Sequence, residues 1–255
     1  MKKSVFILFM CLMMVFAFAG CGGSSEEAAE EETAAAEETT AAEAAEEPTT
    51  GGWEIETEAE AVELPEEVQA AFEKAVEQLD GNDLTPLAYF SKQIVAGTNY
   101  QILCRSLPVT ENPIPKLQVV VIYADLEGNA EITNIADFNI ADYTDNDGAD
   151  LHAEDVAGGW EVPEDYTKAE LPDQVKAAFE KGIEQVGGST FTPMAYLGSQ
   201  VVAGTNYAVL VEGELASQEP VSNIQVAVIY EDLEGNVELT NICTLDPADF
   251  TMRVE

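Results

Sequence analysis

Apolar residues between Leu64 and Gly81 recur every three to four positions, which is the spacing of an amphipathic helix. We expect this helix to begin at Pro65, because proline suits the first helical turn, and to stop at Gly81. Glu66 and Glu67 would then interact favourably with the positive end of the helix dipole. The predicted apolar stripe consists of Val68, Ala71, Phe72, Ala75, Val76 and Leu79.

Extended, apolar stretches follow the predicted helix in two pairs. Residues 84–95 and 99–107 predict a hairpin with a tight tip at Ala96-Gly97-Thr98. Residues 117–123 and 130–138 predict a second hairpin, which turns at 126–129. One helix followed by two hairpins predicts an α+β fold, with one helix packed on a four- to five-stranded antiparallel sheet.

The whole pattern occurs twice, at a separation of 107 residues. Gly52-Trp53 recurs as Gly159-Trp160, and about half of the positions over 51–138 match their counterparts without a gap. Solenoid repeats are much shorter, so this period indicates the duplication of a domain. We therefore predict two tandem domains over 51–143 and 158–255, joined by an acidic linker over 144–157.

The N-terminus has the features of a secretory signal. Two lysines precede an apolar run that is too short to span a bilayer, and small residues lead to Cys21. The segment Phe18-Ala19-Gly20-Cys21 resembles the bacterial lipobox, in which the cysteine is acylated and becomes the mature N-terminus. We expect residues 1–20 to be a signal peptide and Cys21 to anchor an extracytoplasmic lipoprotein to the membrane.

Acidic residues dominate the composition, with 49 Asp and Glu against 10 Lys and Arg and a formal net charge of −39. Such a surface repels nucleic acid and anionic lipid head groups, so neither is an expected partner. The stretch over 21–50 contains many Glu, Ala and Thr residues and no basic residue. We interpret it as a disordered tether that holds the folded part away from the membrane.

Residues suited to catalysis or metal binding are scarce. The single histidine, His152, lies in the linker, so histidine-dependent catalytic sites and zinc clusters are not expected in the domains. We predict no enzymatic activity and no cofactor. The linker residues Asp145, Asp147, Gly148 and Glu154 match part of a calcium loop, but a solvated acidic linker is the preferred interpretation. Cys104 and Cys243 are expected to be small buried residues; a bridge between them stays open.

The tip of the first hairpin resembles a known motif. Residues 93–100 read Gln-Ile-Val-Ala-Gly-Thr-Asn-Tyr and residues 200–207 read Gln-Val-Val-Ala-Gly-Thr-Asn-Tyr. Both are similar to the Gln-x-Val-x-Gly segment of the cystatins, in the form that the stefin branch carries. The order of the predicted elements agrees along nearly the whole of both domains. The resemblance therefore implies two tandem cystatin-like domains.

The resemblance also implies a function, which is reversible, occlusion-type inhibition of papain-like cysteine proteases. In that family an N-terminal glycine-containing stretch and two hairpin tips form a wedge that fills the protease cleft. The implied contact residues in this chain are Gln93, Ile94, Val95, Ala96 and Gly97 with Gly52 and Leu126 in the first copy, and Gln200, Val201, Val202, Ala203 and Gly204 with Gly159 and Leu233 in the second.

The second hairpin departs from the family pattern. Its tip reads Leu126-Glu127-Gly128-Asn129, where the family often has Pro-Trp. One of the three contacts is therefore either missing or supplied by Leu126 and Leu233. The alternative is a non-inhibitory binding, adhesive or scaffold module, in which two copies on one anchor raise the avidity for a repeated partner. In either case we expect a monomer.

Overall fold

The computed structural model describes residues 51–56, 64–144, 158–163, 171–184, 186–215 and 221–251. The chain over Glu46–Glu255 forms one compact unit. The expected signal peptide, the expected lipid site at Cys21, the expected tether, His152 and the partial calcium loop lie outside the described residues. The predictions made for them therefore stay predictions.

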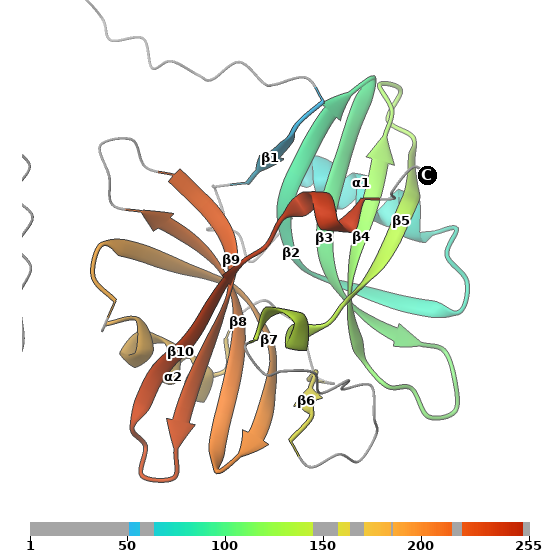
Figure 1. The fold of residues 1–255 in the computed structure, drawn as a ribbon. Coiled ribbons are helices and arrows are strands. Elements are labelled where there is room, and N and C mark those ends of the chain that lie inside the picture. Colours follow the sequence, from blue (N-terminus) through green and yellow to red (C-terminus); the bar gives the residue numbers. More distant parts are fainter. Residues whose placement is uncertain are drawn as a thin grey trace, which may run out of the picture. The chain divides into compact units, whose positions relative to one another are not determined.

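The first repeat forms one antiparallel sheet in the order β1-β2-β3-β4-β5 (Figure 1). Its strands are β1 (Trp53–Ile55), β2 (Asn82–Val95), β3 (Gly97–Pro108), β4 (Lys116–Ala124) and β5 (Ala130–Phe138). The helix α1 (Glu66–Val76) lies between β1 and β2 in the chain, and the 3₁₀ helix η1 (Ile140–Tyr143) follows β5.

The second repeat forms a matching sheet in the order β10-β9-β8-β7-β6. Its elements are β6 (Trp160–Glu161), α2 (Asp173–Ile183), β7 (Ser189–Val202), β8 (Gly204–Leu215), β9 (Val221–Asp232), β10 (Val237–Thr244) and the 3₁₀ helix η2 (Pro247–Phe250). The registers coincide as well, since Trp53 pairs with Gln93 and Trp160 pairs with Gln200. The duplication seen in the sequence is thus a duplication of strand pairing.

Each helix buries the apolar stripe that the sequence predicted, although the helix is shorter than expected. Val68, Ala71, Phe72 and Ala75 are buried on α1, in one cluster with residues of β3 and β4. The helix ends at Val76, so Leu79 lies beyond it and the expected end at Gly81 is wrong. The helix α2 has the same length and ends at Ile183.

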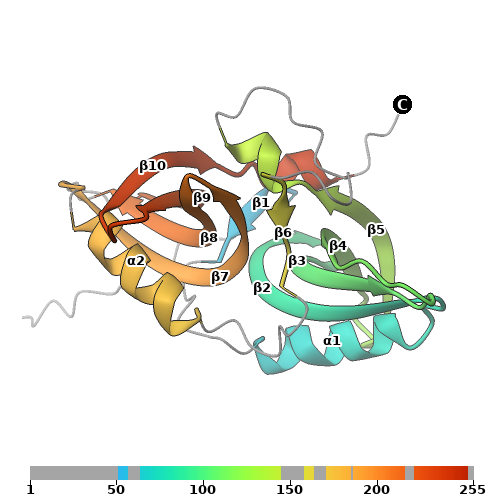
Figure 2. The ribbon, with the colours of Figure 1, turned by 90° about the horizontal axis from the view of Figure 1, so that it is seen from below.

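The strands are long and curved (Figure 2). The strand β2 has 14 residues, and its pairing with β3 shifts register twice, between Pro86 and Ala88 and between Tyr89 and Ser91. Such irregularities bend a strand and increase its twist. Pro86 is tolerated here because β1 pairs with β2 only over Ser91–Gln93, so β2 is an edge strand at Pro86.

The second face of the first sheet is covered by the C-terminal segment of the other repeat. The ring of Phe250 on η2 packs against Phe90 and Phe138, with centroid separations of 6.2 and 6.1 Å. The buried amide of Gln101 donates to the backbone oxygen of Pro247 at 2.8 Å. The first sheet is therefore buried on both faces, by α1 on one and by η2 on the other.

The contact is reciprocal. Asn241 of the second sheet donates to the backbone oxygen of Tyr143 on η1 at 2.9 Å. A side chain at Gly198 of β7 would lie 3.1 Å from Cδ1 of Ile140, so η1 approaches the second sheet closely. One continuous apolar cluster joins residues of both repeats.

These observations correct the predicted fold class. The expectation of two cystatin-like α+β domains, each a helix packed on a sheet, is wrong. The described chain is mainly β, with two five-stranded antiparallel sheets and two α-helices of 11 residues each. The prediction failed because the local pattern of each repeat indicates only the sheet face that the helix covers. The other sheet face is buried by segments of the other repeat.

Candidate functional site

Three segments of each repeat meet at one end of its sheet. The strand β2 runs towards this end and turns into β3 at Ala96. The leader, defined here as residues 51–55 and 158–161, starts beside this turn, because Trp53 pairs with Gln93. The turn between β4 and β5 lies next to it, since Ala124 pairs with Thr98. The register thus gathers the three segments that the resemblance implied.

The hairpin tip is held by the neighbouring strand. The hydroxyl of Tyr123 on β4 donates to the backbone oxygen of Ala96 at 2.7 Å, and Tyr230 makes the same 2.7 Å bond to Ala203. These tyrosines were not among the predicted site residues. The sequence shows that both repeats have a tyrosine at this position, 107 residues apart. A repeated tyrosine does not by itself reveal that its hydroxyl reaches the tip.

The geometry of the tip explains why a glycine stands there. Gly97 has φ +141°, and a Cβ there would lie 2.4 Å from the backbone oxygen of Ala124. Gly204 has φ +143° and the same conflict with the oxygen of Glu231. Only glycine fits these positions, because the space that a side chain needs is filled by the chain's own next strand. The fold itself therefore requires glycine at both tips.

The glutamine of the motif is bonded inside the molecule. Nε2 of Gln93 donates to the backbone oxygen of Gly51 at 2.9 Å, and Oε1 accepts from Nδ2 of Asn99 at 2.8 Å. Gln200 makes the equivalent bonds with Gly158 and Asn206, and only 6% of its surface is exposed. These bonds make each glutamine amide a link between the leader and the hairpin.

The second turn is shaped by an aspartate. Oδ1 of Asp125 accepts from the backbone nitrogens of Glu127 and Asn129, at 3.0 and 2.8 Å. Oδ2 accepts from the side chain of Asn129 at 2.7 Å. The hydrogen bonds from Asn129 lower the pKa of Asp125, and those from Asn236 lower the pKa of Asp232 in the second repeat. The turn is therefore fixed while Leu126 at its tip stays exposed.

Apolar side chains point outwards at this end. The exposed fractions are 40% for Val95, 84% for Leu126, 64% for Val201, 45% for Val202 and 82% for Leu233. Ala96 and Ala203 are exposed, whereas Ile94, Gly52 and Gly159 are half-buried. Within each repeat, the valine of the hairpin and the leucine of the second turn form the apolar part of what we call the loop end.

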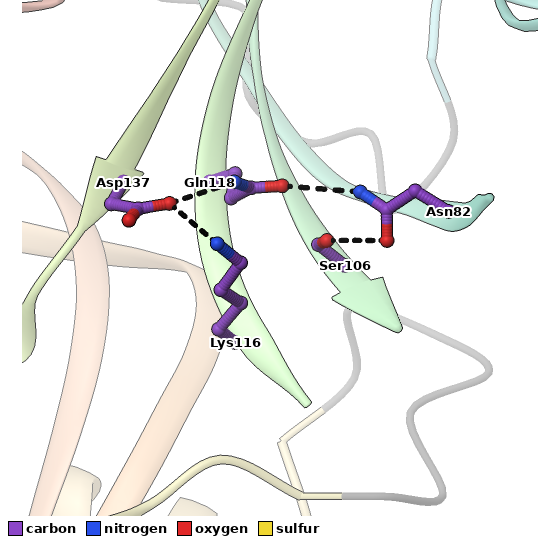
Figure 3. A network of polar contacts seen from close by, with 5 residues as sticks. All are labelled: Asn82, Ser106, Lys116, Gln118 and Asp137. Carbon is purple, nitrogen blue, oxygen red and sulfur yellow. Dashed lines mark hydrogen bonds and ion pairs between the residues drawn. The ribbon is translucent and has the colours of Figure 1, made fainter. Parts of the chain in front are cut away.

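The opposite end of the first sheet is closed by polar contacts (Figure 3). Gln118 donates to Asp137 at 2.7 Å and accepts from Asn82 at 3.4 Å, and Ser106 donates to Asn82 at 2.9 Å. Lys116 forms an ion pair with Asp137 at 2.9 Å. This network joins β2, β3, β4 and β5. Beside it, the β3–β4 connection exposes Val109 and Ile114, at 74% and 52%.

The described residues hold no group of three or more His, Cys, Asp or Glu side chains placed to bind a metal ion. Cys104 and Cys243 are both free thiols, and burial raises the pKa of Cys104 above its usual range. Among the helices that the structure describes, none is long and apolar enough to cross a membrane.

Comparison with known proteins adds no assignment. The sequence matches no model of a known protein family, and no curated protein shows significant similarity to it.

Proposed function

We propose that this chain is a reversible inhibitor of papain-like cysteine proteases that carries two inhibitory loop ends and acts by occlusion. The observation that supports this function best is the strand register, which gathers the leader, the hairpin tip and the second turn at one end of each sheet. These are the three segments that the motif resemblance assigns to the contact.

The chemistry of the loop end suits occlusion. Val95 and Leu126 of the first copy, and Val202 and Leu233 of the second, would lose water on entering a cleft, which favours association. The tip is fixed by Tyr123 and the second turn by Asp125, so little conformational entropy is lost on binding. Blocking a cleft in this way requires no reactive group on the inhibitor.

The expected lipid anchor at Cys21 and the acidic tether complete this proposal. They would display both loop ends outside the cell, held away from a membrane whose surface repels the acidic chain. The proposed partner is an extracellular or surface-associated cysteine protease.

A titration of papain with the purified chain tests the proposal. We expect inhibition at nanomolar to micromolar concentrations, with up to two protease molecules bound per chain. No inhibition at high micromolar concentration would contradict it.

Charged substitutions locate the contact. The paired variant Leu126→Asp with Leu233→Asp should weaken inhibition and leave the fold intact, because both leucines are more than four-fifths exposed. Val109→Asp is the matched control, since Val109 is 74% exposed at the opposite end of the sheet. Equal loss of inhibition in both proteins would argue against contact through the loop end.

One observation favours the alternative of a binding module without inhibitory activity. The opposite end of the first sheet also exposes apolar side chains, at Val109 and Ile114, and no contact within the wedge uses them. This alternative predicts that Ile114→Asp, and not Leu126→Asp, reduces retention on cell-wall or host material.

A further inference from the structure

We propose that Gln93 and Gln200 are positioning residues that clasp the leader to the hairpin, and that they do not contact the protease. The clasp is defined as the motif glutamine together with the asparagine that holds it, Asn99 or Asn206. Its effect on inhibition rests on the proposed function, but its effect on the leader does not.

The amide of Gln93 is engaged at both ends. Its oxygen accepts from Asn99, which is its direct partner in the β2–β3 register, and its nitrogen donates to Gly51. The bond from Asn99 fixes which end of the amide faces the leader, because an asparagine nitrogen donates and requires the oxygen of Gln93. Turning Gln93 outwards to a partner would break both bonds.

The second repeat reproduces the clasp with its own residues. Asn206 donates to Oε1 of Gln200 at 2.8 Å, and Nε2 of Gln200 donates to the backbone oxygen of Gly158. Gln200 is nearly buried, which leaves little surface for a partner. The same geometry therefore arises in two copies that differ at about half of their positions.

The leader has few other attachments near the tip. The strand β1 pairs over three residues and β6 over two. In the first repeat, the backbone nitrogen of Gly51 adds one bond to Ile94, at 3.1 Å. A strand this short is weakly held by its ladder alone, so loss of the glutamine bond should shift the leader towards detachment.

The two tryptophans of the chain report on this directly, since Trp53 lies in β1 and Trp160 in β6. Both are half-buried, and Trp160 packs against the apolar core. In the paired variant Gln93→Ala with Gln200→Ala, we expect tryptophan emission to move to longer wavelength and acrylamide quenching to increase. Inhibition of papain should weaken about tenfold, which corresponds to about 1.4 kcal/mol.

Gln69→Ala is the matched control. Gln69 lies on α1 and donates to Glu73 within the same helix, at 2.7 Å, so this change removes a glutamine amide without touching the leader. Its tryptophan emission and its inhibition should equal those of the parent chain.

A second pair of variants separates detachment from misfolding. Gln93→Glu with Gln200→Glu keeps the shape and the acceptor for Asn99 and Asn206, but it removes the donor to Gly51 and Gly158. Circular dichroism should show an intact fold in this variant, while tryptophan quenching increases as in the alanine pair.

Unchanged tryptophan emission and quenching in both paired variants would overturn the clasp. Weaker inhibition without any tryptophan change would also overturn it, because the glutamines would then act by direct contact. If the parent chain does not inhibit papain, the proposed function fails, and the tryptophan signal still decides whether the clasp exists.

Discussion

The side-chain amide of Asn134 donates a 2.6 Å hydrogen bond to the backbone oxygen of Phe250, which lies 116 residues later in the chain. The counterpart of Asn134 in the second repeat, Asn241, donates to the backbone oxygen of Tyr143. Each sheet thus holds the 3₁₀ helix that follows the other sheet. The two repeats thus complete one another through these segments.

Because each sheet holds the 3₁₀ helix of the other repeat, a substitution in the second repeat should destabilise the first. Phe250→Ala removes a buried ring from the face of the first sheet and should cost about 3–5 kcal/mol of unfolding free energy. Chemical denaturation measures the loss, and hydrogen exchange should show faster exchange of the β4 amides. Val109→Ala, at an exposed position, should change stability by less than about 0.5 kcal/mol. Unaltered hydrogen exchange of the β4 amides in Phe250→Ala would contradict the packing of η2 on the first sheet.

The two turns of the loop end should differ in their tolerance of alanine. Gly97→Ala combines a positive φ with a Cβ placed 2.4 Å from the oxygen of Ala124, and we expect a loss of at least about 2 kcal/mol. Gly128 has φ +81° and no atom nearer than 3.9 Å, so Gly128→Ala should cost about 1 kcal/mol. Thermal unfolding of the two variants measures the difference, and equal losses would contradict the steric argument.

The polar network of Figure 3 should contribute more to the free energy of unfolding than the equivalent contact in the second repeat. Asp137→Ala leaves the buried amide of Gln118 without its 2.7 Å acceptor and should cost about 1–3 kcal/mol. The equivalent position in the second repeat is Thr244, which accepts from Gln225 at 3.4 Å, and Thr244→Ala should cost less than about 1 kcal/mol. Urea denaturation distinguishes the two. A larger loss for Thr244→Ala would be inconsistent with the network.

The second turns should respond to acid in a defined direction. The folded-state pKa of Asp125 is lowered, first by the side chain of Asn129, and that of Asp232 is lowered by Asn236. A lowered folded pKa stabilises the turn at pH values above the ordinary aspartate pKa of 3.8, and this contribution is lost as the pH falls through the lowered value. Carboxyl titration by NMR measures both groups. In Asn129→Ala and Asn236→Ala the two pKa values should rise towards 3.8, and unchanged values would contradict the assigned cause.

Much of the local structure could be predicted from the sequence. The apolar spacing located the helix, and the tight tip at Gly97 and the turn at Gly128 were found because each needs a residue that accepts positive φ. The repeat also predicted that both copies contain the same elements in the same order. These features depend on residues close together in the chain, where periodicity and turn chemistry are informative.

The remaining structure depends on partners that are distant in sequence. Ile140 and Phe250 look like the ends of domains, and no local pattern indicates that each lies against the other repeat. The fold class was predicted wrongly for this reason. The residues of the loop end were found by resemblance. The hydrogen bonds of Gln93 within the chain, and the steric conflict between a Cβ at Gly97 and Ala124, could not be predicted, because they depend on how three strands pair.

The exchange of η1 and η2 also bears on how the duplicated gene persists. Two similar coding segments invite recombination that would delete one of them. In this chain such a deletion would remove the cover from an apolar sheet face of the surviving copy, at Phe90 and Phe138 or beside Gly198. A chain left with a single copy would therefore expose an apolar sheet face to water, which opposes its folding.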